Sequence, residues 1–349
     1  MRPLVGLSSD ELASLAKELG QPAYRGKQIG RWLYHAYAAT FDEMSDLPAG
    51  LRAALVAGFT IGTGRCVSAS LATDGTEKLA VRFGEDAVVE CVRLPYEDRV
   101  SVCLSCQEGC AMRCAFCATG ISGFRRNLTR GEILQQFLLL QARAPERRIS
   151  HVVFMGMGEP MHNLDEVLGA ARILVGEVGL SARSITVSTV GVVPGILQLA
   201  EAGLPINLAV SLHAPDDGVR AGLIPAARKW PMSEVLDACR QYRAKTGRDL
   251  TYEYLLIAGV NDDPDQAQRL ADTLRGAPGS VNLIPYNPVP GAPGFHRPSG
   301  QSVQRFRAVL EAAGRHVTQR QERGGTVDAA CGQLRLRALS EPAGLGGAR

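Results

Sequence analysis

Residues 100–117 read Val-Ser-Val-Cys-Leu-Ser-Cys-Gln-Glu-Gly-Cys-Ala-Met-Arg-Cys-Ala-Phe-Cys, an apolar run followed by a loop dense in cysteine. The run Val100–Leu104 is rich in β-branched and apolar residues, which predicts a buried strand. Five of the nine cysteines of the chain lie between Cys103 and Cys117. An odd number of cysteines gathered in this way does not suit a disulfide framework and indicates a metal site in a reducing compartment.

Outward from this loop, strand-like and helix-like segments alternate. Five further runs predict strands: His151–Met155, Ser184–Thr189, Asn207–Leu212, Thr251–Ile257 and Ser280–Ile284. Amphipathic stretches that predict helices lie between them and after the last: Thr129–Gln141, Asn163–Val175, Pro194–Ala202, Met232–Thr246, Asp265–Leu274 and Gln301–Ala313. This alternation predicts right-handed βαβ units and a parallel sheet, with Val317–Gln321 as a candidate last strand. Six units are too few for a closed eight-stranded barrel, so the α/β fold is a partial barrel or a doubly wound sheet.

The residues before this alternation follow other patterns. Residues 1–60 predict short helices, with a helix start at Ser8–Glu11. Within residues 61–98, the runs Leu79–Phe83 and Ala87–Val92 flank a turn and predict a β-hairpin. We therefore expect four segments: a helical domain at 1–60, a hairpin extension at 61–98, the α/β unit at 99–335 and a flexible glycine-rich tail at 336–349.

The composition indicates a soluble globular protein, with 46% hydrophobic and 21% charged residues and a net charge of +3. No apolar stretch of about 18 residues is present, and residues 1–15 lack the apolar core of a signal peptide, so we expect a cytoplasmic protein. Of the 38 basic residues, 33 are arginines, which favours contact with phosphate, although GC-rich coding would have the same effect. Basic charge is concentrated at residues 121–150 and 301–349.

Polar residues and glycines follow five of the predicted strands. They are the cysteine loop, Gly156–Pro160, Ser188–Gly191, Ser211–His213 and Tyr286–Pro288. Because ligands of parallel α/β proteins bind beyond the carboxyl ends of the strands, we expect these residues to share one pocket. Polar strand ends also occur in sheets without a site there.

The spacing C-x3-C-x2-C of Cys110, Cys114 and Cys117 is the strongest chemical signal. Thiolates are soft ligands that select zinc, copper(I) or iron–sulfur clusters. Three thiolates on a four-iron cluster leave one iron open to a substrate, whereas structural zinc requires a fourth ligand, here Cys103 or Cys106. The alternatives are a structural zinc loop and reduced cysteines of the core.

The cysteine spacing after the first strand of a six-unit βα chain resembles the radical S-adenosylmethionine (SAM) superfamily. Further motifs resemble the RlmN/Cfr family of radical SAM RNA methyltransferases: residues 24–33, Gln107–Cys110, Cys117–Gly120, Gly156–Pro160, Ser188–Pro194, Ser211–Pro215, Val281–Pro288 and Ala329–Leu334. This resemblance extends from about residue 20 to residue 335. It implies a partial (β/α)6 radical SAM barrel with a small N-terminal RNA-recognition domain.

The resemblance also implies the cofactors and the residues that bind them. Cys110, Cys114 and Cys117 match the ligands of one [4Fe–4S] cluster, whose open iron chelates SAM. The residues that match SAM-contacting positions are Gly158, Glu159, Ser188, Ser211, Leu212, His213 and Asn287. A carboxylate at Glu159 suits the ammonium group of SAM. The family uses two SAM molecules per turnover, one to methylate a cysteine and one to generate a radical.

Three further residues match the family's catalytic positions. Cys331 corresponds to the cysteine that carries the methyl group, and Cys103 corresponds to the thiol that releases the RNA adduct and forms a transient disulfide with Cys331. Glu90 corresponds to the base that accepts the ring proton. Considered alone, Cys331 would be a buried or free thiol, Glu90 the solvent face of a strand and His213 a satisfied histidine at a strand end.

The resemblance implies methylation of C2 of an adenine in 23S rRNA (adenine 2503), and it allows adenine 37 of tRNA as a second substrate. An electron donor such as flavodoxin is implied as a partner, with no membrane. Arg125, Arg126 and Arg130, beside the cysteine loop, are candidate phosphate contacts. The alternative within the family is methylation of C8 of the same rRNA adenine. The alternative of another class is a zinc-stabilised RNA-binding module.

Overall fold

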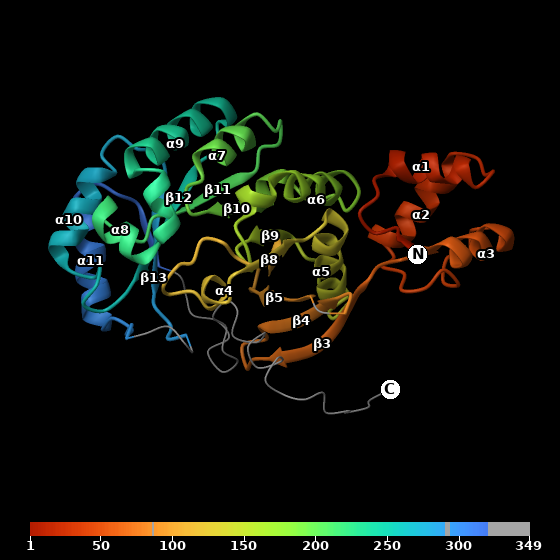
Figure 1. The fold of residues 1–349 in the computed structure, drawn as a ribbon, viewed down its shortest axis with the longest axis horizontal. Coiled ribbons are helices and arrows are strands. Elements are labelled where there is room, and N and C mark those ends of the chain that lie inside the picture. Colours follow the sequence, from red (N-terminus) through yellow and green to blue (C-terminus); the bar gives the residue numbers. More distant parts are fainter. Residues whose placement is uncertain (86, 290–293, 320–349) are drawn as a thin grey trace.

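The computed structural model describes residues 1–85, 87–289 and 294–319. Its N-terminal part contains the helices α1 (Ser9–Glu18), α2 (Tyr24–Tyr34) and α3 (Ala49–Gly58). The short strands β1 (Arg2–Pro3) and β2 (Phe59–Thr60) pair in parallel and bring the two ends of this part together. Ser8 begins α1 with a capping box, as its sequence predicts, because its hydroxyl accepts from the backbone N–H of Glu11 and its own N–H donates to the Glu11 carboxylate. These helices lie at one end of the molecule (Figure 1).

One large sheet forms the centre of the described structure. In spatial order its ten strands are β14 (Val317–Gln319), β13 (Ser280–Pro285), β12 (Leu250–Leu256), β11 (Asn207–Ser211), β10 (Ile185–Thr189), β9 (His151–Phe154), β6 (Val100–Cys103), β5 (Ala87–Pro95), β4 (Glu77–Phe83) and β3 (Gly64–Leu71). Neighbours from β6 to β14 pair in parallel, and β3, β4, β5 and β6 pair antiparallel. The six predicted strands of the alternation and the candidate last strand are therefore confirmed.

The strand order decides between the two α/β architectures. From β6 to β14 the strands follow one another in space as they do along the chain, with no reversal of direction. A doubly wound sheet requires such a reversal, so the structure is the partial barrel. Its helices lie along the outer side of the curved sheet (Figure 1). They are α5 (Arg130–Ala142), α6 (Leu164–Gly176), α7 (Val193–Ala200), α8 (Asp217–Leu223), α9 (Met232–Thr246), α10 (Pro264–Thr273) and α11 (Gly300–Ala312).

The expected hairpin extension has one more strand than the sequence pattern indicates. Strands β4 and β5 form the predicted hairpin, and β3 pairs with the outer side of β4. Strand β3 is an edge strand with small and polar residues and mostly exposed side chains, and a bulge between Cys66 and Ser68 interrupts its pairing. These features hide the alternation that identifies a half-buried strand.

Short elements complete the part of the chain that the structure describes. They are β7 (Gln107–Gly109), β8 (Phe124–Asn127), α4 (Ala118–Ile121) and the 3₁₀ turns Pro160–Asn163, Ala182–Ser184 and Pro225–Lys229. None of the described helices combines the length and the apolar character needed to cross a bilayer. The division into four segments stays a prediction.

Candidate active site

A cavity of about 340 Å³ lies at the carboxyl ends of the parallel strands. Its wall includes eight of the residues predicted to bind SAM or to act in catalysis: Glu90, Cys103, Gly158, Glu159, Ser188, Ser211, His213 and Asn287. They come from the ends of β6, β9, β10, β11 and β13 and from β5 of the antiparallel extension. The fold therefore brings together residues that lie almost two hundred positions apart in the chain.

The cysteine loop forms one side of this cavity. It begins after β6, passes through β7, which pairs with β8, and carries Cys110, Cys114 and Cys117 between the two strands. The N–H of Cys110 donates to the carbonyl of Gly123 (3.0 Å). Cys110 and Cys114 are buried, whereas Cys117 is half-buried and lines the cavity.

The three thiols fit an iron–sulfur cluster. Cys110 and Cys114 belong to one cluster of buried residues, and Cys117 packs against it. Burial raises the pKa of Cys114 well above its ordinary value, and negative charge on Cys117 and Cys110 raises it further. Such a buried trio needs a cation to be stable as thiolates. Within the described ranges, no three His, Cys, Asp or Glu side chains converge on a single metal ion. A cluster suits this arrangement better than zinc does, because its thiolates bind different irons.

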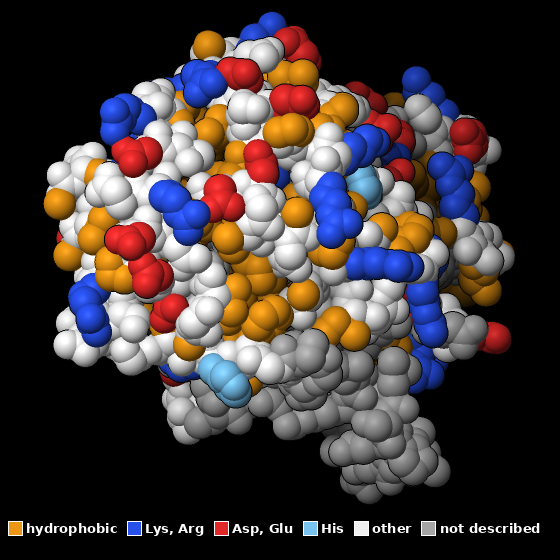
Figure 2. All heavy atoms as spheres, turned by 60° about the vertical axis from the view of Figure 1, so that its left-hand side comes forward, with side chains coloured by type: hydrophobic (Ala, Val, Ile, Leu, Met, Phe, Trp, Pro, Cys, Tyr) orange, Lys and Arg blue, Asp and Glu red, His pale blue; other side chains and the backbone are white. Residues whose placement is uncertain are grey.

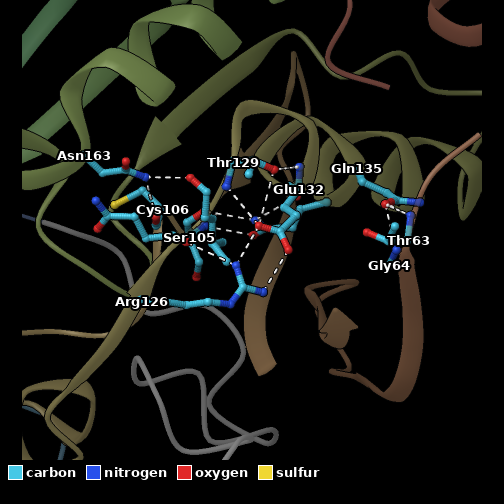
Figure 3. A network of polar contacts seen from close by, with 12 residues as sticks. Thr63, Gly64, Ser105, Cys106, Arg126, Thr129, Glu132, Gln135 and Asn163 are labelled. Carbon is cyan, nitrogen blue, oxygen red and sulfur yellow. Dashed lines mark hydrogen bonds and ion pairs between the residues drawn. The ribbon is translucent and has the colours of Figure 1, made fainter. Parts of the chain in front are cut away.

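Polar contacts fix the start of the cysteine loop onto α5 and the segment after β9, as Figure 3 shows. The side chain of Gln136 accepts from the N–H of Ser105 (2.9 Å) and donates to its carbonyl (2.9 Å). The Asn163 amide donates to the carbonyl of Cys106 (2.8 Å). Arg126 of β8 forms a two-pronged ion pair with Glu132 of α5, with both N–O distances 2.8 Å. These contacts fix the loop against the parallel sheet, and Cys103 and Cys117 are the described cysteines that line the cavity.

Backbone amides hold the buried carboxylate of Glu159. One carboxylate oxygen accepts from the N–H of Val190 (2.9 Å) and the other from the N–H of Met161 (3.1 Å). Burial raises the pKa of Glu159 to about 7, although these hydrogen bonds lower it. The preceding Gly158 has φ of +110°, and a Cβ there would lie 2.8 Å from the sulfur of Cys106. Only glycine fits this turn, which places Glu159 in the cavity wall.

His213 is neutral and has a defined tautomer. Its Nδ1 accepts from the N–H of Leu255 (3.0 Å), which leaves the proton on Nε2. Burial lowers the pKa of His213 to about 3, and the charge of Arg220 adds to this effect. The ring of Phe116, from the cysteine loop, meets the His213 ring edge-on at 5.1 Å. His213 therefore supplies one hydrogen-bond donor between the cysteine loop and the end of β11.

Glu90 lies in the part of the cavity formed by the antiparallel extension. Its side chain is 5% exposed, so the interpretation as the solvent face of a strand is wrong. The ammonium of Lys78, from the neighbouring β4, lies 3.8 Å from the Glu90 carboxylate. The hydroxyl of Ser105 donates to the carbonyl of Glu90 and accepts from the N–H of Met157 (2.8 Å). Ser105 therefore links the extension to the parallel sheet.

Four predicted site residues are not among the described residues that line the cavity: the buried Cys110 and Cys114 of the cysteine loop, Leu212 and Cys331. Leu212 is fully buried, and its N–H donates to the backbone carbonyl of Glu253 (3.1 Å). Cys331 lies outside the described residues. Conversely, the sequence predictions missed Lys78 and Glu253, which also line the cavity. A charged residue within an otherwise apolar strand, as in Leu-Thr-Tyr-Glu-Tyr-Leu-Leu at 250–256, is the signal that could have identified them.

Comparisons with known proteins identify the family of this chain. Residues 104–271 match the family model described as the radical SAM superfamily, and residues 3–61 match the one described as the ribosomal RNA large subunit methyltransferase N-terminal domain. A relative from Rhodopirellula baltica, described as a probable dual-specificity RNA methyltransferase RlmN, is 50% identical over 95% of this chain and 90% of its own length. A relative from Symbiobacterium thermophilum with the same description is 47% identical over 97% of this chain and 92% of its own.

A solved structure shows the same similarity. The crystal structure of a radical SAM methyltransferase from Sphaerobacter thermophilus superimposes with a TM-score of 0.92. The two chains are 44% identical, and the match covers 95% of this chain and 99% of the other. The agreement includes both the partial barrel and the N-terminal helices.

Proposed function

The chain belongs to the RlmN family and has the radical SAM fold, and we propose that it methylates C2 of an adenine in RNA. Members of the radical SAM superfamily use a [4Fe–4S] cluster and SAM, which together supply one-electron chemistry. Such chemistry is required because C2 of adenine is an electron-poor carbon and does not displace a methyl group from SAM directly.

In this proposal the RNA substrates are 23S rRNA, at adenine 2503, and tRNA, at adenine 37. The relatives' description as dual-specificity RNA methyltransferases supports two RNA substrates. Lys and Arg side chains gather beside exposed hydrophobic side chains on one side of the face in Figure 2, which suits a phosphate backbone. We place the protein in the cytoplasm, where the proposed RNA substrates and an electron donor such as flavodoxin would be available. The described cysteines form no disulfide bonds, which suits a reducing compartment.

The residues at the carboxyl ends of the parallel strands would bind the cofactors. Cys110, Cys114 and Cys117 would hold the cluster. The carboxylate of Glu159 would bind the ammonium group of SAM, because its described partners are backbone N–H groups and no ion pair to it is found within residues 1–85, 87–289 and 294–319. The remaining contacts to SAM would come from Gly158, Ser188, Ser211, Leu212, His213 and Asn287.

The residues near the antiparallel extension would act on the base. Glu90 would accept the proton from the ring carbon, since it is the carboxylate of the extension that lines the cavity. Cys331 would carry the methyl group, and Cys103, which lines the same cavity, would form a disulfide with Cys331 as the adduct is released. The target adenine must leave its stack to reach this buried position.

One observation carries the proposal: most of the residues that we propose to bind SAM line the same cavity as Glu90 and Cys103, which we propose to act on the base. The test is mass spectrometry of nucleosides from RNA incubated with the iron-loaded enzyme, SAM and a reductant. We expect 2-methyladenosine, whereas 8-methyladenosine would support the alternative at C8. Cys331→Ala should abolish the product, and Cys103→Ala should trap a protein–RNA adduct. An unmethylated RNA pool with the wild-type enzyme, or zinc in place of iron, would contradict the proposal.

A further inference from the structure

Arg220 of α8 is the largest fully buried side chain among the described residues, with 1% of its surface exposed. Burying a guanidinium removes its hydration, so an anion or a full set of acceptors must compensate. The hydrogen bonds of Arg220 go to two neutral backbone carbonyls, those of Trp230 (3.1 Å) and Val190. Its Nε has no hydrogen-bond partner in the described part of the chain. The positive charge is therefore only partly compensated.

The nearest acidic group does not remove this excess of charge. Asp217, one turn earlier on α8, is exposed and accepts from the N–H of Met232 (2.8 Å). Water and salt screen an exposed carboxylate, so its attraction for a buried cation is weak. Asp217 also makes none of the described hydrogen bonds of Arg220, so it offsets the charge of the guanidinium only in part.

Helix α8, which carries Arg220, lies beside the cysteine loop. Helix α8 packs against this loop, and the carbonyl of Leu223 accepts from the N–H of Ala115, which lies between two of the cysteines (2.9 Å). The guanidinium also bonds to Val190, whose own N–H donates to Glu159. Val190 packs against the cluster of buried residues that contains Cys110, Cys114 and Leu223, so the guanidinium lies beside the residues that surround these two cysteines.

We propose that Arg220 is a positioning residue for the iron–sulfur cluster: its buried positive charge offsets the negative charge of the thiolate-bound cluster and raises the cluster's reduction potential. Reduction adds one electron to a site that three thiolates already make negative. A fixed cation in a low-dielectric surrounding stabilises the reduced form more than the oxidised form. The inference rests on the proposed ligation by Cys110, Cys114 and Cys117, and it requires neither RNA nor SAM.

The test is a redox titration of the iron-loaded protein, followed by electron paramagnetic resonance, in Arg220→Gln, Arg220→Lys and wild type. At a fixed potential we expect Arg220→Gln to lower the ratio of reduced to oxidised cluster about tenfold, a shift of about 59 mV to more negative potential. Arg220→Lys keeps the charge and should stay close to wild type. The matched control is Arg248→Gln, because Arg248 also has an unpartnered Nε but lies before β12, at the other end of the strands.

Each outcome bears on the proposal. A wild-type potential in folded, iron-loaded Arg220→Gln would overturn it, as would an equal shift in Arg248→Gln. If Arg220→Gln does not fold or does not retain iron, Arg220→Lys is the deciding variant. The proposal requires Arg220→Lys to load iron and to have the wild-type reduction potential. A tenfold lower ratio of reduced to oxidised cluster in Arg220→Lys would contradict the proposal. Retention of a full cluster by Cys114→Ala would instead contradict the proposed ligation, so the two failures are distinguishable.

Discussion

Glu159 and Glu90 are two of the carboxylates that line the cavity, and the parts of the fold that hold them provide different partners. In the parallel sheet, backbone N–H groups of Met161 and Val190 bind Glu159, and its pKa is raised to about 7. In the antiparallel extension, Glu90 has the ammonium of Lys78 at 3.8 Å. The comparison suggests a division of work. Glu159 can accept a cation from a ligand, whereas Glu90 has a cation supplied by the protein and can serve as a base beside it.

The largest effect is expected from removing Glu90, the proposed base. Glu90→Gln should lower RNA methylation by about 10²–10⁴-fold, the usual contribution of a general base, while leaving SAM affinity unchanged. Turnover with a fixed RNA fragment measures this. The matched control is Glu77→Gln, since Glu77 is also a buried carboxylate of the extension, paired with Arg143 (2.7 Å), but does not line the cavity. Equal losses in both variants would contradict a catalytic role for Glu90.

The partner of Glu90 can be tested through stability. Lys78→Met leaves a buried carboxylate beside an apolar group and should lower the free energy of unfolding by about 3 kcal/mol. Urea unfolding measures this change. Adding Glu90→Gln to the same chain should recover part of the loss, because the remaining side chain is then neutral. Strictly additive losses would show that the two side chains do not stabilise each other.

Glu159 should behave differently, because its proposed partner is SAM. Glu159→Gln should weaken SAM binding by about 2 kcal/mol, the value of a hydrogen bond to a charged group. In the wild type, SAM affinity should fall as the pH decreases through about 7, because the raised pKa of Glu159 causes its carboxylate to be protonated there. Calorimetry of the iron-loaded protein at several pH values measures both effects. A Gln variant with the pH dependence of the wild type would refute this role.

The smallest effect concerns the connection between the two regions. Ser105→Ala removes the hydrogen bonds that link Glu90 to Met157 and should cost about 1 kcal/mol of stability, with turnover changed little. Thermal unfolding measures the difference. Ser14→Ala, at an exposed serine of α1, is the control and should have no measurable effect. A stability loss no larger than that of the control would show that Ser105 does not join the two regions.

The parallel sheet was predictable from the sequence, and the antiparallel extension was predictable only in part. Strands such as Asn207–Ser211 are continuous apolar runs that end in polar residues, so both the strand and its contribution to the site can be inferred. Strand β3 has no such run. The pairing of Lys78 with Glu90 depends on the register of β4 and β5, and the burial of Arg220 depends on how α8 packs on the cysteine loop. Local sequence patterns contain neither.

The division of work between the two carboxylates is tested most directly by measuring RNA methylation as a function of SAM concentration in Glu159→Gln and Glu90→Gln. The account predicts that saturating SAM restores most of the activity of Glu159→Gln, because only binding is impaired, and restores none in Glu90→Gln. Recovery of Glu90→Gln at high SAM, or failure of Glu159→Gln to recover, would contradict it.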